Sequence, residues 1–185
     1  MSEASERYRK VAAGFTRRVQ AVPAGAWGLP APCEGWVARD VVGHLVEWLP
    51  AFFLTGVWDL GVGPLPSADD DPVAAWAALD AAMQAALDDP AIAASERDTP
   101  MGRMSFEAAV GMIATTDVLI HTWDLARATG LDEALDPDEV RAYLAGTSDQ
   151  MADMLVASGH YGPRVPVAAD ASEQDRLLAF LGRQP

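Results

Sequence analysis

Residues 106–130 have the sequence FEAAVGMIATTDVLIHTWDLARATG, which carries a strong helical pattern. Ser105 precedes it, in the position where an N-cap side chain accepts hydrogen bonds from the first turn of a helix. Gly130 ends it, where a residue in the left-handed conformation usually stops a helix. The sequence therefore predicts one long helix over residues 106–129, and the apolar run VLI in its middle is typical of burial.

Three earlier segments carry the stripe of amphipathic helices, with apolar residues at three- and four-residue spacing. They begin near residues 5, 37 and 72. Asp71 and Pro72 supply an N-cap and a first-turn proline for the third segment. Pro50 is expected to kink the second helix or to end its first section. Together with the helix over residues 106–129, these segments predict a four-helix bundle.

The C-terminal part of the chain predicts two further helices. Asp136 and Pro137 open the fifth helix, and a short final helix runs from Ser172 to Leu181. The expected buried face of the fifth helix consists of Val140, Tyr143, Leu144, Met151, Met154 and Leu155. Breakers between residues 88 and 104 leave room for a short extended piece near Gly102.

The fold class follows from these segments. No stretch alternates convincingly between apolar and polar residues with period two, which half-buried strands require. We therefore expect an all-α fold, a four-helix bundle with additional C-terminal helices. A chain of 185 residues is long enough for one well-filled core, so we expect a single domain over residues 1–185.

Composition narrows the classes of partner. The 27 acidic side chains outnumber the 13 basic ones, and the formal net charge of −14 opposes broad electrostatic binding to nucleic acid or to an anionic membrane. No apolar run approaches the ~18 residues of a membrane span, and the N-terminus lacks the apolar core of a secretory signal. Cys33 is the only cysteine, which excludes an internal disulfide and fits a reducing compartment. We expect a cytoplasmic protein with small-molecule partners, and a homodimer through an exposed helix face stays open.

Two of the three histidines lie in segments that are expected to be buried, where a polar side chain needs a chemical reason. His44 lies inside the apolar stripe of the second helix, and His121 lies in the middle of the fourth. Asp117 precedes His121 by four residues and Asp124 follows it by three, so the helical repeat puts these three side chains on one side of the helix. Imidazole and carboxylate groups at this spacing can chelate a divalent metal ion, for which His44 on a facing helix is the natural third ligand.

A structural interpretation stays open beside the metal hypothesis. Each histidine could be a satisfied core residue, with Asp117 or Asp124 holding His121 through a hydrogen bond. A D-x-x-x-H pattern taken alone favours that interpretation, because it is short. Asp124 can equally be a partner that orients a ligating histidine or a plain surface acid.

Three other residues have ordinary interpretations as well as functional ones. Glu47 has the ordinary interpretation of a solvated acid on a helix surface. Its functional interpretations are a general base or an alternative metal ligand. Cys33 fits a small buried apolar residue, although it could approach the metal. His160 fits an exposed or capping loop histidine.

Three segments together resemble a known family. PCEGWVARDVVGHLVEW at residues 32–48, DVLIHTWDLARATG at residues 117–130 and PVAADASEQDRLLAFLG at residues 166–182 are similar to the N-terminal family of actinobacterial mycothiol-dependent maleylpyruvate isomerases. That family is a branch of the DinB-like metal-binding bundles. The resemblance spans essentially the whole chain, and its motifs are specific in combination.

The resemblance implies a DinB-type four-helix bundle with a divalent metal ion held by His44, Asp117 and His121. Zinc is the favoured ion, with nickel and manganese as alternatives, and mycothiol is implied as a thiol cofactor. The better-known isomerase has glutamate at the acid position, where this chain has the shorter Asp117.

The resemblance also bounds the activity. The full isomerase continues into a second domain that helps to bind its dicarboxylate substrate, whereas this chain ends at Pro185, so we do not expect the maleylpyruvate reaction itself. We expect a metal-dependent thiol transferase or isomerase-like enzyme that uses a metal-activated thiol or water on a small electrophile. The alternative is a helical bundle that binds a metal ion or a small ligand without catalysis.

Overall fold

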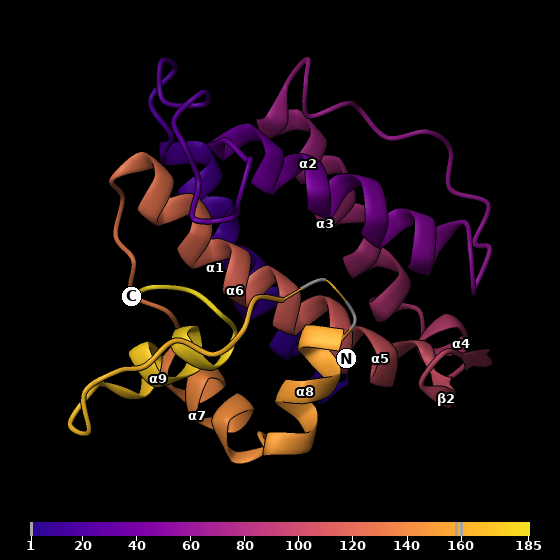
Figure 1. Ribbon diagram of the computed structural model, residues 1–185. Coiled ribbons are helices and arrows are strands. Elements are labelled where there is room, and N and C mark those ends of the chain that lie inside the picture. Colours follow the sequence, from indigo (N-terminus) through magenta and orange to yellow (C-terminus); the bar gives the residue numbers. More distant parts are fainter. Residues whose placement is uncertain (1, 158, 160) are drawn as a thin grey trace. The chain divides into compact units, whose positions relative to one another are not determined.

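The computed structural model in Figure 1 describes residues 2–157, 159 and 161–185, and the chain forms two compact units. The first unit ends at Glu133, and the second begins at Ala134. Helices hold 59% of the described residues, which also contain one two-stranded sheet, so the all-α prediction is confirmed. No helix among these residues is long and apolar enough to cross a bilayer. That residues 1–185 act as a single domain stays a prediction.

Four long helices build a bundle in the first unit (Figure 1). They are α1 (Glu3–Ala21), α2 (Ala38–Leu49), α3 (Pro72–Asp88) and α6 (Thr115–Thr129). Helix α1 packs against α3 and α6, and α2 packs against the same two helices. Phe15 of α1 and Trp76 of α3 meet edge to face with 4.6 Å between ring centroids. The observed bundle therefore uses the four segments that the sequence predicts.

The helix ends follow the capping residues of the sequence. Asp71 Oδ1 accepts hydrogen bonds of 3.0 Å from the backbone N–H groups of Val73 and Ala74 at the start of α3. Gly130 ends α6 with a φ of 69°, in the left-handed region that glycine adopts without strain. The helix ends of α3 and α6 therefore lie where these local signals place them.

Two π-helical turns adjoin the bundle helices. The first begins at Pro50, where the sequence predicts a kink or the end of the first section of the second helix, and the second lies inside the helix predicted over residues 106–129. The turns are η1 (Pro50–Leu54), directly after α2, and η2 (Val110–Ala114), between α5 (Phe106–Ala109) and α6. Each turn closes on a threonine whose N–H and Oγ1 both donate to the carbonyl five residues earlier, Thr55 to Pro50 and Thr115 to Val110. The single helix predicted over residues 106–129 is therefore three segments, because the wider turn shifts the register just before α6.

A short hairpin precedes α5. Helix α4 (Pro90–Ala93) leads into β1 (Glu96–Thr99), which pairs antiparallel with β2 (Gly102–Ser105). The extended piece expected near Gly102 is thus one strand of a pair. Its partner was not predicted because the residues ERDT are polar and mostly exposed, so no alternation marks them.

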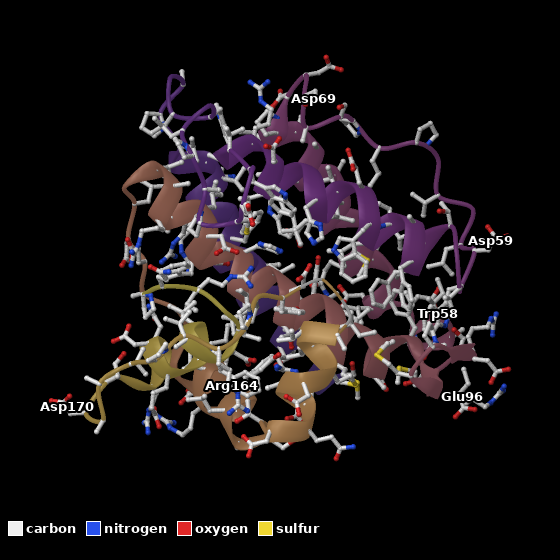
Figure 2. All side chains as sticks on the ribbon, in the orientation of Figure 1. Trp58, Asp59, Asp69, Glu96, Arg164 and Asp170 are labelled. Carbon is white, nitrogen blue, oxygen red and sulfur yellow. The ribbon has the colours of Figure 1, made fainter. Side chains whose placement is uncertain are left out.

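The long connection between η1 and α3 is tied to this hairpin through Trp58. The Trp58 indole is buried, and its Nε1–H donates to the carbonyl of Ser95 at 3.0 Å. Figure 2 shows Trp58 beside the hairpin that carries Glu96, while Asp59 and Asp69 of the same connection project outward. Trp58 therefore anchors one end of a connection in which Ala68 is also buried.

The second unit contains α7 (Pro137–Ala145), α8 (Asp149–Ala157) and α9 (Glu173–Phe180). The prediction of one continuous fifth helix is wrong. The chain turns after α7, and Ser148 Oγ accepts from the backbone N–H of Met151 to start α8. Because the break rotates the apolar stripe, Val140 of α7 is buried whereas Met154 of α8 is 64% exposed. His160 lies outside the described residues.

Candidate metal centre

Helix α2 presents His44 beside its buried face. Asp40 Oδ2 accepts from the backbone N–H of Val37 at 2.8 Å, which fixes the first turn. The face toward the bundle core is completely buried and consists of Val41, Val42, Leu45 and Leu49. His44 stands at the edge of that face with 29% of its side chain exposed, so its ring is accessible from solvent.

Helix α6 brings Asp117 and His121 to the same place. The side chains of Asp117 and His121 are 13% and 5% exposed, and the distance from His121 Nε2 to Asp117 Oδ1 is 3.5 Å. His44 Nε2 lies 3.3 Å from the other oxygen, Asp117 Oδ2. One ligand atom from each of the three residues lies within 4.8 Å of the other two. The three predicted ligands therefore converge from two facing helices.

The Asp117 carboxylate is held by several groups at once. Trp48 Nε1–H donates to Oδ2 at 2.9 Å, from the turn of α2 that follows His44. Burial acts to raise the pKa of Asp117, but the charge of His121, with a hydrogen bond and charge from His44 and the Trp48 hydrogen bond, outweighs it and lowers the pKa. Asp117 is therefore an anion at neutral pH, which is the form that binds cations.

Asp124 lies on the opposite side of the His121 ring. Its side chain has no exposed surface, and its Oδ2 is 2.9 Å from His121 Nδ1. The same oxygen lies 3.6 Å from Cys33 Sγ, which donates to it. Of the two interpretations left open by the sequence, the surface acid is therefore wrong, because this carboxylate is buried against a candidate ligand.

Trp36 covers the two histidine rings. Its ring centroid lies 5.1 Å from that of His44 and 5.9 Å from that of His121, nearly parallel to the latter at 21°. The tight turn that carries Cys33 and Trp36 is closed by hydrogen bonds between their backbone groups and between Ala31 and Trp36. Two residues of this turn therefore act on His121. Trp36 stacks on the face of the ring, and Cys33 donates to Asp124, the carboxylate at the edge of the ring.

Sequence reasoning missed the two tryptophans as parts of the site. A signal for Trp48 existed, because it follows His44 by four residues and so shares its side of α2. The position of Trp36 had no such signal, because it depends on how the loop folds back onto the bundle.

The donor set fits a divalent cation. Two imidazole nitrogens and a carboxylate oxygen suit zinc and related ions. In the part of the chain that the structure describes, no fourth histidine, cysteine, aspartate or glutamate joins this group within the same limit, and Glu47 is exposed. Metal binding by His44, Asp117 and His121 stays a prediction.

Comparisons with known proteins place the chain in a family. The family model described as mycothiol maleylpyruvate isomerase N-terminal domain matches residues 8–55, the segment that includes His44. Two proteins of Mycobacterium tuberculosis, both named as uncharacterized, MT0763 of strain CDC 1551 / Oshkosh and Rv0738 of strain ATCC 25618 / H37Rv, are each 32% identical to the chain over 175 residues. The matches cover 91% of this chain and 91% of each relative. The chain belongs to this isomerase-domain family.

Family membership confirms the resemblance seen in the motifs. It makes the chain a DinB-like, mycothiol-related domain of a family associated with metal binding. The relatives' printed names assign no activity. No solved structure matches the chain.

Proposed function

We propose that this protein is a metal-dependent enzyme that adds a low-molecular-weight thiol, mycothiol in particular, to a small electrophile, or isomerises the electrophile through such an addition. His44, Asp117 and His121 would hold the metal ion, with zinc as the first candidate and nickel and manganese as alternatives. The observation that carries the proposal is the convergence of these three ligand atoms within 4.8 Å. Two helices supply these atoms, which already lie close enough together to surround one metal ion after small movements.

The three proposed ligands supply different groups to the metal site. Asp117 supplies an anionic oxygen whose ionised form is favoured by its neighbours. His44 and His121 supply imidazole nitrogens from the two facing helices. The chemistry that a divalent cation provides when bound by such a set is Lewis-acid activation of a thiol or a water.

Access from solvent supports a catalytic role over a structural ion. Structural zinc sites usually have four protein ligands, whereas catalytic sites have three, and three converge here among the described residues. The exposed fraction rises from 5% at His121 to 29% at His44, so a small molecule would approach from the His44 side. Trp36 and Trp48 flank His44 and would limit the water that reaches a bound substrate.

The thiol in this proposal comes from a small molecule. The only cysteine, Cys33, is outside the group of three ligands and donates to Asp124. We further propose a cytoplasmic location, where low-molecular-weight thiols are reduced, and small molecules as the partners, because the net charge of −14 opposes nucleic acid and anionic membranes.

A non-catalytic bundle is the second candidate. It is favoured by the way the same side chains satisfy one another, since Asp117 accepts from Trp48 at 2.9 Å and lies against both histidines. Polar groups that satisfy one another in this way do not require an ion. In that case the chain would bind a metal ion or small ligand without turning over a substrate.

Elemental analysis of the purified protein separates these functions. After dialysis without chelator, the wild type is expected to hold close to one metal ion per chain, and His44→Ala and His121→Ala are expected to hold almost none. Thr122→Val is the matched control, because Thr122 is buried beside His121 but donates to the Val118 carbonyl.

A second measurement tests catalysis. The metal-loaded wild type is expected to consume mycothiol in the presence of small electrophiles, and the two histidine variants are not. No metal in the wild type, even after reconstitution with zinc, nickel or manganese, would rule out a metalloenzyme, and metal without thiol consumption would favour the non-catalytic bundle.

A further inference from the structure

His121 lies between two carboxylates, and the two contacts are unequal. Asp124 Oδ2 is 2.9 Å from Nδ1 of the ring, a hydrogen-bond distance. Asp117 Oδ1 is 3.5 Å from Nε2, on the opposite edge. A neutral imidazole carries a single proton, so only one of these carboxylates can receive it as a hydrogen bond.

We propose that Asp124 is the positioning residue of the candidate centre, which holds the proton of His121 on Nδ1 and leaves the Nε2 lone pair directed toward Asp117 and His44. The reason for such a positioning residue rests on the proposed metal function. The position of the proton on His121 is a property of the metal-free protein and can be measured without the metal. Asp124 acts through His121 and is not itself a ligand.

The burial of Asp124 explains why the proton of His121 should strongly prefer Nδ1 to Nε2. A carboxylate without exposed surface is costly unless donors compensate its charge. Two of those donors converge on Oδ2, the His121 Nδ1–H and the Cys33 S–H. The contact with His121, at 2.9 Å, is the shorter of the two, and hydrogen bonds to a carboxylate are stronger than those between neutral groups. Carboxylate partners of this kind commonly orient histidines that bind metal ions.

The surroundings also fix the plane of the ring. Trp36 stacks nearly parallel to His121, with 5.9 Å between ring centroids, and His121 is on the same helix as Asp124, three residues earlier. The ring therefore has little freedom to rotate and exchange its two nitrogens. Proton location then decides which nitrogen can bind a cation.

A competing reading makes Cys33, His121 and Asp124 a metal site of their own, since their ligand atoms also lie within 4.8 Å of one another. In that site Nδ1 would be a ligand and could not carry the proton. The two readings therefore predict opposite protonation of the same nitrogen. They also differ in whether sulfur binds the ion, which an optical spectrum reports.

The first test is the nitrogen-15 NMR spectrum of His121 in the metal-free wild type, recorded at alkaline pH where the ring is neutral. We expect a pyrrole-like shift for Nδ1 and a pyridine-like shift for Nε2. In Asp124→Asn, which keeps the shape of the side chain, the Asp117 carboxylate competes against a neutral amide, and we expect the Nε2–H form to become the major tautomer. Thr122→Val is the control and should leave the tautomer unchanged.

The second test is metal affinity, with zinc and with cobalt as its optical probe. We expect Asp124→Asn to weaken binding by about 10- to 100-fold and Cys33→Ser to leave the cobalt spectrum unchanged. A sulfur-to-cobalt charge-transfer band in the wild type that disappears in Cys33→Ser would overturn the positioning role.

These readouts separate this inference from the proposed function. A wild type that has the Nδ1–H tautomer but binds no metal keeps the positioning role and refutes the metal function. A wild type that binds metal through His44, Asp117 and His121 but has the proton on Nε2 in its metal-free form overturns the inference alone. The wild-type spectrum decides this even if Asp124→Asn fails to fold.

Discussion

Trp48 and Asp117 are joined by a hydrogen bond of 2.9 Å from the indole Nε1–H to Oδ2. This contact links α2 to α6 at the level of the candidate ligands, because Trp48 follows His44 by four residues on the same helix. The Asp117 oxygen that accepts it is the one that lies 3.3 Å from His44 Nε2. The indole therefore fixes the carboxylate that stands between the two histidines.

We predict that Trp48→Phe weakens zinc affinity by about 10-fold, because partners that orient a ligand typically contribute on that scale. Phenylalanine keeps most of the aromatic packing but cannot donate to Asp117. Titration calorimetry or competition with a chromophoric chelator measures the change.

The matched control is Trp58→Phe. Trp58 is also buried, and it donates to the Ser95 carbonyl at 3.0 Å, away from the ligands. Losing this hydrogen bond should lower the free energy of unfolding by about 1 kcal/mol and leave zinc affinity unchanged. Equal loss of affinity in both variants would mean that Trp48 acts through general stability.

Added zinc is expected to raise the Tm of the wild type, because a ligand that binds only the folded state stabilises it. At 100 times the Kd the gain in free energy is about 2.7 kcal/mol. Asp117→Ala should show no zinc-dependent shift, and a chelator should return the wild type to the Tm of its metal-free form. A zinc-dependent shift that persists in Asp117→Ala would place the binding site elsewhere.

Asp88→Asn tests an acid-sensitive link between α1 and α3. The hydroxyl of Ser5 donates to Asp88 Oδ1 at 2.6 Å, and Gln84 and Arg9 donate to the same carboxylate. The Ser5 hydrogen bond leads in lowering the pKa of Asp88, followed by those of Gln84 and Arg9. A lowered pKa means that the charged form stabilises the fold above the ordinary value near 4, and that this contribution disappears as the pH falls through the lowered pKa.

We therefore expect the wild type to be more stable than Asp88→Asn near pH 7, with the difference vanishing in strongly acidic solution. Urea denaturation of both proteins across the acid range measures it. Asp69→Asn is the control, since Asp69 is an exposed acid in the connection before α3, and it should show no such pH-dependent difference.

Tyr8→Phe tests the alkaline side. Tyr8 has no exposed surface, and burial first, then the charge of nearby Asp80, raises its pKa. Tyr8 therefore stays protonated in the folded state at a pH near 10, where the tyrosine of the unfolded chain ionises. As the pH rises above that value, ionisation favours the unfolded chain and the free energy of unfolding falls. Tyr8→Phe should unfold less readily than the wild type above pH 10 and stay within about 1 kcal/mol of it at pH 7. Identical alkaline denaturation curves would contradict this assignment.

Local patterns were enough to predict the four bundle helices and the spacing of Asp117 and His121. Amphipathic periodicity and caps such as Asp71 and Gly130 act within a few residues, so they are legible without a structure. The break between α7 and α8 and the π turn before α6 were missed, because apolar spacing continues across both while the backbone does not. The strand Glu96–Thr99 was missed because it is recognised only through its pairing with Gly102–Ser105.

The helical class, the acidic charge and the candidates His44, Asp117 and His121 could be predicted from the sequence, because composition and a 3.6-residue repeat are properties of the chain alone. Three relationships became visible only in the folded protein: His44 lies 3.3 Å from Asp117, Trp48 donates to that carboxylate, and Asp124 is buried against His121. These relationships depend on how α2 and α6 face each other and on how the turn from Cys33 to Trp36 folds back over them. Distances between segments far apart in the chain are set by packing, which no local pattern encodes.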